Sequence, residues 1–335
     1  MTQRKKINWI LILQGWAMLW VVIGHAFLGK AGKGPEWENM LFHFAYSFHM
    51  PLFMLVSGYL FYLTRLKPVN PAWGGQIWTY PAIIKDKALR LLLPGLVFSI
   101  ISLAFKIAFP GEMSRQAGLS LPELAHSYLF PYDNAMRELW FIVTLFWMML
   151  MSPIWKLVIN KTWTMLGTLI LVGVLHFWHP NTDFLCIQRA FSFAIWFYLG
   201  IIICKTDAVG RLFNRIPWIT ILVGIVIYVV GCFTHKFVTT MGGIVFSFGI
   251  ALLADLYLPK LFYSFRNYTY QIFLIGIFAQ MFIKIIYRHI SMPYILAYIL
   301  CILVGLYVPV IISKILEMLN WKPLLLCVGL KKKSK

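Results

Sequence analysis

The stretch NWILILQGWAMLWVVIGHAF, residues 8–27, decides the fold class. It is apolar over about twenty residues, the length that an α-helix needs to cross the hydrocarbon core of a bilayer. Similar runs recur along the 335-residue chain, which is 61% hydrophobic and only 12% charged, with a mean hydropathy of +0.78. Because soluble proteins carry about 25% charged residues, the sequence predicts an all-α membrane protein.

We expect one membrane domain over residues 1–335, built as a bundle of ten transmembrane helices. The apolar runs that define them cover residues 8–28, 41–63, 88–109, 138–158, 163–178, 188–204, 217–233, 238–257, 268–288 and 293–318. No small-x-small cleavage site follows the first run, so we expect it to be retained rather than removed as a signal peptide. The five cysteines form no C-x-x-C pair, and no disulfide framework or zinc site is predicted.

The net charge of +19 is distributed unevenly between alternate loops. Basic residues gather on the side of the N-terminus: Arg4, Lys5, Lys6, Arg65, Lys67, Lys85, Lys87, Arg90, Lys156, Lys161, Lys205, Arg211, Arg215, Lys260, Arg266 and the tail of residues 331–335. Most acidic residues fall on the other side: Glu36, Glu38, Glu112, Glu123, Asp133, Glu138 and Asp183. This asymmetry follows the positive-inside rule, so both termini are expected in the cytoplasm. The charge is therefore assigned to the membrane surface and not to a nucleic acid.

Two connecting segments are long. Residues 67–87 form an inner loop rich in Pro, Gly, Trp and Tyr, whose aromatic side chains are expected at the level of the lipid headgroups. Residues 109–138 form an outer loop that contains a short predicted helix from Pro122 to Leu129. A loop of that length is either a binding element or a plain connector.

Gln14 and His25 lie in the first span, eleven residues apart. On an α-helix they face nearly the same way, about 20° apart, and are separated by about 16 Å along the axis. Polar groups in a membrane span usually face the bundle interior or a wet cavity. Gln14 either bonds a neighbouring helix or belongs to such a cavity, and His25 is either a satisfied interfacial histidine or a reactive one.

The second span favours the reactive interpretation of the histidines. His49 precedes Pro51, which frees a backbone carbonyl in the preceding turn. In a helical hairpin with the first span, His25 and His49 reach similar depths near the outer surface. Two such imidazoles are typical of proton-handling chemistry. Ser57 and Gly58 form a small-residue site that another helix or a thin ligand can approach closely.

Other polar residues begin the later spans on the outer side. Glu138 either belongs to an interfacial ion pair or orients a histidine or an acceptor sugar, and Trp140 either anchors the helix at the interface or stacks on a sugar ring. Arg189 either snorkels to the interface or stabilises an oxyanion. On the inner rim, three basic residues stand shortly before Pro94: Lys85, Lys87 and Arg90. They either carry membrane-surface charge or bind a phosphate-rich donor.

At these residues the chain resembles the acyltransferase type 3 family of bacterial integral-membrane acyltransferases. The matching pieces are LQGWAMLWVVIGHAF in the first span, FHMPLFMLVSGYLF in the second, KALRLLLPG before the third, ELWFIVTLF in the fourth and FYLGIII in the sixth. The order and spacing of the first four are specific, whereas the later spans match in hydropathy alone.

The resemblance implies transfer of an acyl group, commonly acetyl, from cytosolic acyl-CoA to a hydroxyl of an extracytoplasmic glycan. The family's first-span signature is a basic residue, ten others and a histidine, so His25 is the implied general base. Two departures stand out. Gln14 occupies the basic position and cannot neutralise a phosphate, a role that the inner-rim cations could take over. The ninth span carries Gly276 where relatives often have histidine, leaving Gln271 and Gln280.

We therefore predict a multi-pass acyltransferase of the bacterial inner membrane, with acyl-CoA as donor substrate and no permanently bound cofactor. His49, Glu138 and Arg189 would orient the base, bind the acceptor or stabilise the oxyanion. Ser57 as a covalent acyl carrier is an alternative. No metal site is expected, because the histidines lack a paired i, i+4 spacing. The rival prediction is an exporter or flippase that moves glycan without acyl transfer. Acceptor, acyl group and homo-oligomerisation are left open.

Overall fold

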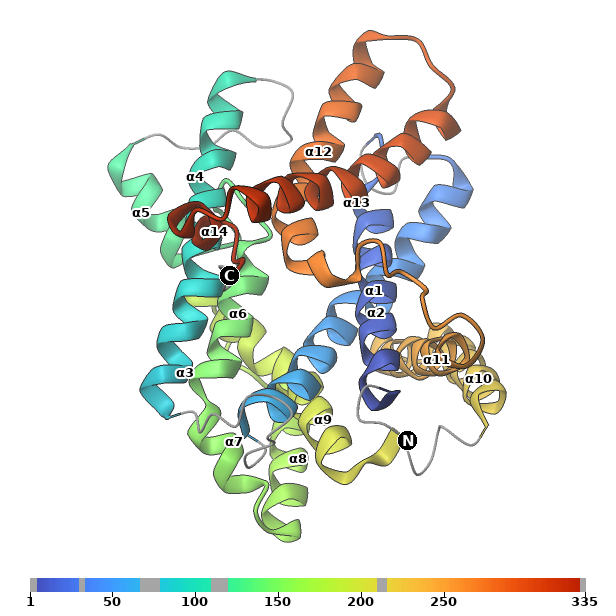
Figure 1. Cartoon of the computed structure of the whole chain (residues 1–335). Helices are drawn as coiled ribbons and strands as arrows, with labels where there is room; N and C mark the ends of the chain where they lie inside the picture. Colours follow the sequence, from blue (N-terminus) through green and yellow to red (C-terminus); the bar gives the residue numbers. More distant parts are fainter. Residues whose placement is uncertain (1–4, 30–33, 67–78, 110–119, 210–215, 332–335) are drawn as a thin grey trace. The chain divides into compact units, whose positions relative to one another are not determined.

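The computed structural model describes residues 5–29, 34–66, 79–109, 120–209 and 216–331, and within them the chain forms helices and no strand (Figure 1). The helices are α1 (Lys5–His25), α2 (Glu36–Phe61), η1 (Tyr62–Leu66), α3 (Tyr80–Lys87), η3 (Ala88–Leu92), α4 (Leu93–Ala108), α5 (Leu121–Leu129), α6 (Leu139–Leu150), α7 (Ser152–Val158), α8 (Thr162–Phe177), η4 (Phe184–Cys186), α9 (Ile187–Thr206), α10 (Pro217–Phe233), α11 (Lys236–Tyr257), η6 (Arg266–Tyr268), α12 (Thr269–His289), α13 (Tyr294–Leu319) and α14 (Lys322–Cys327). The all-α expectation is confirmed for this part of the chain.

Seven helices of the described chain are long and apolar enough to cross a membrane: α1, α2 with η1, α3 with η3 and α4, α9 with η4, α11, α12 with η6, and α13. The pair α6 and α7 adds an eighth if it is one span, bent by 51°. Helices α8 and α10 coincide with predicted spans but have only 16 and 17 residues. The multi-pass prediction is confirmed, whereas the count of ten and the cytoplasmic termini stay predictions.

The long connecting segments are described in part. The helix predicted from Pro122 to Leu129 is confirmed as α5, which begins with a capping box between Ser120 and Glu123. Most of the inner loop, residues 67–78, lies outside the described residues, as do Arg4, Lys67, Glu112, Arg211, Arg215 and residues 332–335 of the charge argument.

The chain divides into two compact units, Met1–Val56 with Ile203–Ile315 and Ser57–Ile202 with Leu316–Lys335, called here the first and the second unit. The single-domain expectation stays a prediction.

In the first unit, α1 packs against α11 and α12 through polar contacts along its length. Gln14 Nε2 donates to Thr269 Oγ1 at 2.7 Å, and Gln280 Nε2 donates to the carbonyl of Val22 at 2.9 Å. The sequence separation of these pairs changes only from 255 to 258, so α1 and α12 run parallel. Against α11 the separation falls from 247 at Asn8 to 231 at Trp16, as expected for antiparallel helices.

Helix α2 continues through Pro51, and the structure shows how its missing hydrogen bond is replaced. Proline has no N–H, so the carbonyl four residues earlier, that of Ser47, loses its helical donor. The hydroxyl of Thr240 on α11 donates to that carbonyl at 2.7 Å. The freed carbonyl expected from the sequence is therefore satisfied by a neighbouring helix, which is how membrane proteins tolerate proline within a span.

Helices α10 and α11 form an antiparallel hairpin whose backbones approach closely (Figure 1). A Cβ atom at Gly231 would overlap the backbone of Thr239, and one at Gly242 would overlap the backbone of Tyr228. Small residues that let backbones meet in this way are typical of helix packing in membranes. In the second unit, Gly58 serves the same purpose, because a Cβ there would overlap the backbone of Phe197 on α9. The small-residue site at Ser57 and Gly58 thus receives a helix.

Candidate active site

In the first unit, the two predicted histidines meet at one aromatic ring. His25 is the last residue of α1, and its ring lies edge-on to that of Tyr46 with centroids 6.0 Å apart. Tyr46 and His49 are one helical turn apart on α2, so they share a face, and their rings lie 4.9 Å apart. The rings of His25 and His49 therefore both contact the ring of Tyr46.

The two histidines differ in burial and in hydrogen bonding. His49 is 2% exposed, and its Nδ1 lies 2.5 Å from the carbonyl oxygen of Ala45. A carbonyl can only accept a hydrogen bond, so Nδ1 carries the proton and the neutral ring keeps its lone pair on Nε2. His25 is half-buried and closes the end of its helix. A substrate can reach His25 more readily than His49.

Lys284 of α12 stands beside His25, and the sequence analysis did not single it out. Its ammonium donates to the backbone carbonyl of His25 at 2.8 Å and lies 4.4 Å from the ring centroid of Phe27. A cation at the C-terminal end of α1 is favoured by the unpaired carbonyls there. The signal that could have found it is a lysine inside an apolar helix, since such residues are functional candidates by default.

Glu38 supports the same end of α1 and was previously counted only as an outer acidic residue. It is 3% exposed, and its carboxylate accepts hydrogen bonds from the backbone N–H of Leu28 at 3.3 Å and the hydroxyl of Tyr294 at 2.6 Å. The carboxylate therefore ties the turn after α1 to the beginning of α13. This contact holds the chain that follows His25 in place.

At the other end of α1, polar side chains join helices. Gln14 bonds Thr269, as the helix-packing alternative for this residue proposed. Asn8 donates to Asp255 at 2.6 Å and accepts from Arg266 at 2.8 Å. Gln14 thus lies at a helix interface, with its amide oxygen still able to accept.

In the second unit, Arg189 and Trp140 meet around Tyr132. The guanidinium of Arg189 donates to the Tyr132 hydroxyl at 2.8 Å and lies over the rings of Tyr132 and Trp140, at 4.9 and 5.4 Å from their centroids. Arg137 lies 4.8 Å from the centroid of the same tyrosine ring. Cations over aromatic faces are attracted by the ring electrons, so this stack is a fixed positive surface. Glu138 is half-buried just before α6, and Ser57 is half-buried on α2.

A basic cluster forms in the second unit where α3 passes into η3. The carboxylate of Asp86 pairs with Arg65 at 2.9 Å and with Arg90 at 2.6 Å. Lys331 of the C-terminal tail joins them: burial lowers its pKa, and the charges of Arg90 and Arg65 lower it further. Lys87 belongs to the same helix turn, and Lys85 is exposed on α3. Arg65 and Arg90 lie in the π-helices η1 and η3, a form of helix that is frequent at functional sites.

The fold and these polar centres define a multi-pass membrane protein with histidines and cations at helix ends. Residues 7–314 match the model of a family described as an acyltransferase domain, and the chain belongs to that family. The resemblance seen in the sequence is thereby confirmed, and the chain is a membrane acyltransferase by family and by its apolar helices. The comparison with curated proteins found no match, and the comparison with solved structures found none either.

Proposed function

We propose that this protein is an acyl-CoA-dependent O-acyltransferase of the bacterial inner membrane that transfers an acyl group, most simply acetyl, to a hydroxyl of an extracytoplasmic glycan. His25 is the general base. The observation that carries this proposal is the half-buried His25, whose ring lies against that of Tyr46 and whose backbone carbonyl accepts from Lys284, in a chain of an acyltransferase family.

The donor docks at the basic cluster of the second unit, on the cytoplasmic side. Acyl-CoA carries several phosphates, and guanidinium groups bind phosphate oxygens in pairs. Asp86 holds Arg65 and Arg90 through its two oxygens, so both guanidiniums are oriented before the donor arrives. Lys85, Lys87 and Lys331 add positive charge to the cluster. Among the described residues, none of these three lysines forms an ion pair with a carboxylate of the cluster.

A ten-span topology with cytoplasmic termini is part of this proposal, and helix direction supports it. Parallel spans must have an odd number of crossings between them. The seven long candidates put four between α1 and α12, which would make these two helices antiparallel. The bent pair alone raises the number to five, and the bent pair with α8 and α10 raises it to seven; both odd numbers agree with the parallel packing of α1 and α12. Because α10 packs along α11, it is favoured as a span despite its length.

The chemistry proceeds at the proposed outer end of α1. His25 takes the proton of the acceptor hydroxyl while that oxygen attacks the thioester carbonyl and forms a tetrahedral oxyanion. The oxyanion then collapses, the C–S bond breaks, and the departing thiolate of CoA receives the proton from the imidazolium. General-base help of this kind typically gives about 10²- to 10⁴-fold.

Other residues have supporting roles in this scheme. The ammonium of Lys284 favours the developing oxyanion, because fixed positive charge near such an oxygen stabilises it. His49 orients the reacting groups through Nε2. Arg189 and Trp140 form an acceptor-binding surface with Glu138 beside it. Gln14 hydrogen-bonds the amide arm of the donor through its oxygen, and Ser57 is assigned to donor binding.

The test uses purified full-length protein in lipid vesicles. Labelled acetyl-CoA is supplied on the side of the proposed cytoplasmic face, and glycan acceptors are supplied on the other side. Wild-type protein should transfer label to glycan, and His25→Ala should abolish transfer. His43→Ala is the matched control, because His43 is an exposed histidine of α2. It should leave transfer unchanged. If wild-type protein exports glycan without labelling it, and the export survives His25→Ala, the transferase is refuted and the exporter is favoured.

A further inference from the structure

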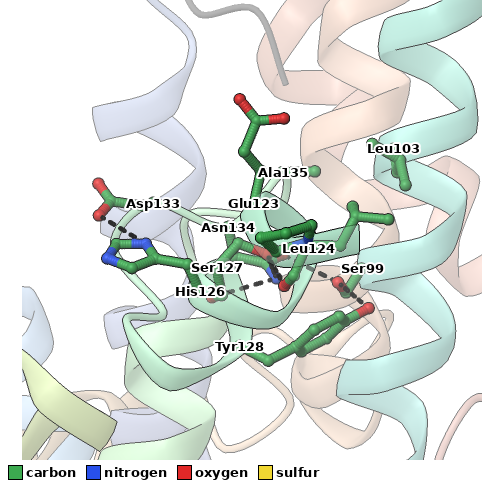
Figure 2. A pocket seen from close by; sticks show the side chains of 11 residues that line it. Ser99, Leu103, Glu123, Leu124, His126, Ser127, Tyr128, Asp133, Asn134 and Ala135 are labelled. Atoms are coloured by element: carbon green, nitrogen blue, oxygen red, sulfur yellow. Dashed lines mark hydrogen bonds and ion pairs between the residues drawn. The ribbon is translucent and has the colours of Figure 1, made fainter. Parts of the chain in front are cut away.

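A cavity of about 480 Å³ lies within the second unit, and none of its lining residues has a role in the proposed mechanism (Figure 2). Its walls come from Ser99 and Leu103 of α4, from α5, and from the turn of residues 133–135. The volume falls in the range of small-molecule sites, about 300–1,000 Å³. This size suits one or two sugar rings.

Polar side chains on one wall of the cavity are held in place by Asn134, which is 4% exposed. Its amide oxygen accepts from the Ser99 hydroxyl at 2.8 Å and from the N–H of Met136 at 2.9 Å. Its amide nitrogen donates to the Ser127 hydroxyl at 3.3 Å, and the hydroxyls of Ser99 and Tyr128 lie 3.0 Å apart. Figure 2 shows these side chains converging from α4, α5 and the turn. The wall is therefore preorganised, which lowers the cost of binding.

The charge of the cavity selects among ligands. Glu123 and Asp133 line it with carboxylates, and the one basic group among its lining residues is the imidazole of His126, 3.9 Å from Asp133. Hydrogen bonds from Ser120 hold the pKa of Glu123 below its ordinary value, so this carboxylate is ionised at neutral pH. Such a lining repels phosphates and carboxylates. It suits hydroxyl groups and ammonium groups.

The basic cluster and the cavity draw on the first and second halves of one continuous helical segment. Asp86 and Arg90 are near the start of Tyr80–Ala108, and Ser99 and Leu103 are near its end. At 1.5 Å per residue, the thirteen residues from Arg90 to Leu103 span about 20 Å. If the basic cluster faces the cytoplasm, as proposed above, the cavity lies toward the outer side of this segment.

We propose that this cavity binds a sugar unit of the acceptor, and that the sugar is neutral or carries an amino group rather than an acid. Calling the ligand an acceptor rests on the proposed function. The recognition itself rests on the hydroxyls, the amide and the carboxylates of the cavity. Leu103 and Ala135 supply apolar contacts for the C–H faces of the ring.

Binding is tested without any donor, by saturation-transfer NMR on the full-length protein in nanodiscs. The probes are methyl β-glucoside, methyl β-glucosaminide and methyl β-glucuronide. We expect saturation of the first two probes and a signal at least about fivefold weaker for the glucuronide, because its carboxylate is repelled by the carboxylates that line the cavity. Equal signals for all three probes, or none, would overturn the proposal.

Two variants and a control sharpen the test. Ala135→Trp fills the cavity and should abolish saturation of the glucoside, whereas Asp133→Asn should raise the glucuronide signal toward that of the glucoside. Glu36→Gln removes an exposed carboxylate elsewhere and should change nothing. Size-exclusion chromatography checks folding, and the conservative Asp133→Asn still decides if Ala135→Trp does not fold. Unchanged binding in both variants refutes the cavity site.

This result is separable from the proposed function. If glycosides bind but no label moves from acetyl-CoA, the acyltransferase proposal fails and the sugar site stands. If label moves normally in Ala135→Trp with an unchanged KM for the acceptor, the sugar site fails and the transferase stands.

Discussion

The end of α1 that carries His25 and the start of η3 that carries Arg90 are both polar regions in apolar surroundings, but they are built differently. Around His25, the side chains of Tyr46 and His49 form ring contacts, and single hydrogen bonds run to backbone carbonyls from His49 and Lys284. Around Arg90, the contacts are ion pairs, in which the carboxylate of Asp86 is shared between the guanidiniums of Arg65 and Arg90.

The difference matches two kinds of chemistry. A general base needs a neutral nitrogen with a lone pair, and an ion pair with a carboxylate would favour the protonated imidazole instead. A phosphate site needs permanent positive charge, and guanidinium supplies it at any physiological pH. The first region is suited to moving a proton, and the second to holding an anion.

The largest effect should separate the two regions kinetically. His25→Ala should lower kcat by about 10²- to 10⁴-fold with little change in the KM for acyl-CoA, because a lost general base weakens only the transition state. Arg90→Ala should chiefly raise the KM for acyl-CoA. Initial rates over a range of acyl-CoA concentrations measure both parameters. A raised KM in His25→Ala with normal kcat would contradict the comparison.

The next largest effect concerns stability. Asp86→Asn leaves the nearly buried Arg65 and the partly buried Arg90 without their counterion and should lower the free energy of unfolding by about 3 kcal/mol. The measurement is the thermal unfolding midpoint in detergent or nanodiscs. Asp207→Asn is the control, since Asp207 is exposed. Equal midpoints for the two variants would show that the cluster is not an ion-paired one.

Replacing Lys284 should affect the other region more modestly. Lys284→Met keeps the length of the side chain and removes the ammonium that donates to the His25 carbonyl. We expect kcat to fall about tenfold, equivalent to about 1.4 kcal/mol, with an unchanged KM for acyl-CoA. Lys236→Met removes an exposed lysine at the start of α11 and should have no effect. An unchanged kcat in Lys284→Met would limit this lysine to structure.

The smallest effect concerns the turn that carries His49. Thr240→Val removes the hydroxyl that donates to the Ser47 carbonyl and should cost about 1 kcal/mol of stability. In the double variant Pro51→Ala with Thr240→Val, the new N–H of residue 51 can donate to the same carbonyl. The thermal midpoint should then recover relative to Thr240→Val alone. No recovery would show that Thr240 stabilises the fold by other contacts.

Much of the architecture could be read from the sequence because hydropathy and helical period are local properties. Each of the ten predicted segments falls on a helix, and α5 was predicted almost to the residue. The shared face of Tyr46 and His49 follows from a separation of three residues, and their meeting with His25 follows from the short connection between the first two helices.

The tertiary structure alone decided which groups are partners across long separations. At the end of α1, Lys284 bonds His25 across 259 positions of the chain, and Glu38 bonds Tyr294 across 256 positions. The backbone of α9 packs directly against Gly58, and the cavity around Asn134 is formed by α4 together with α5. Periodicity says which face of a helix is polar, but the partner of that face depends on how helices pack, and packing is not a local property of the chain.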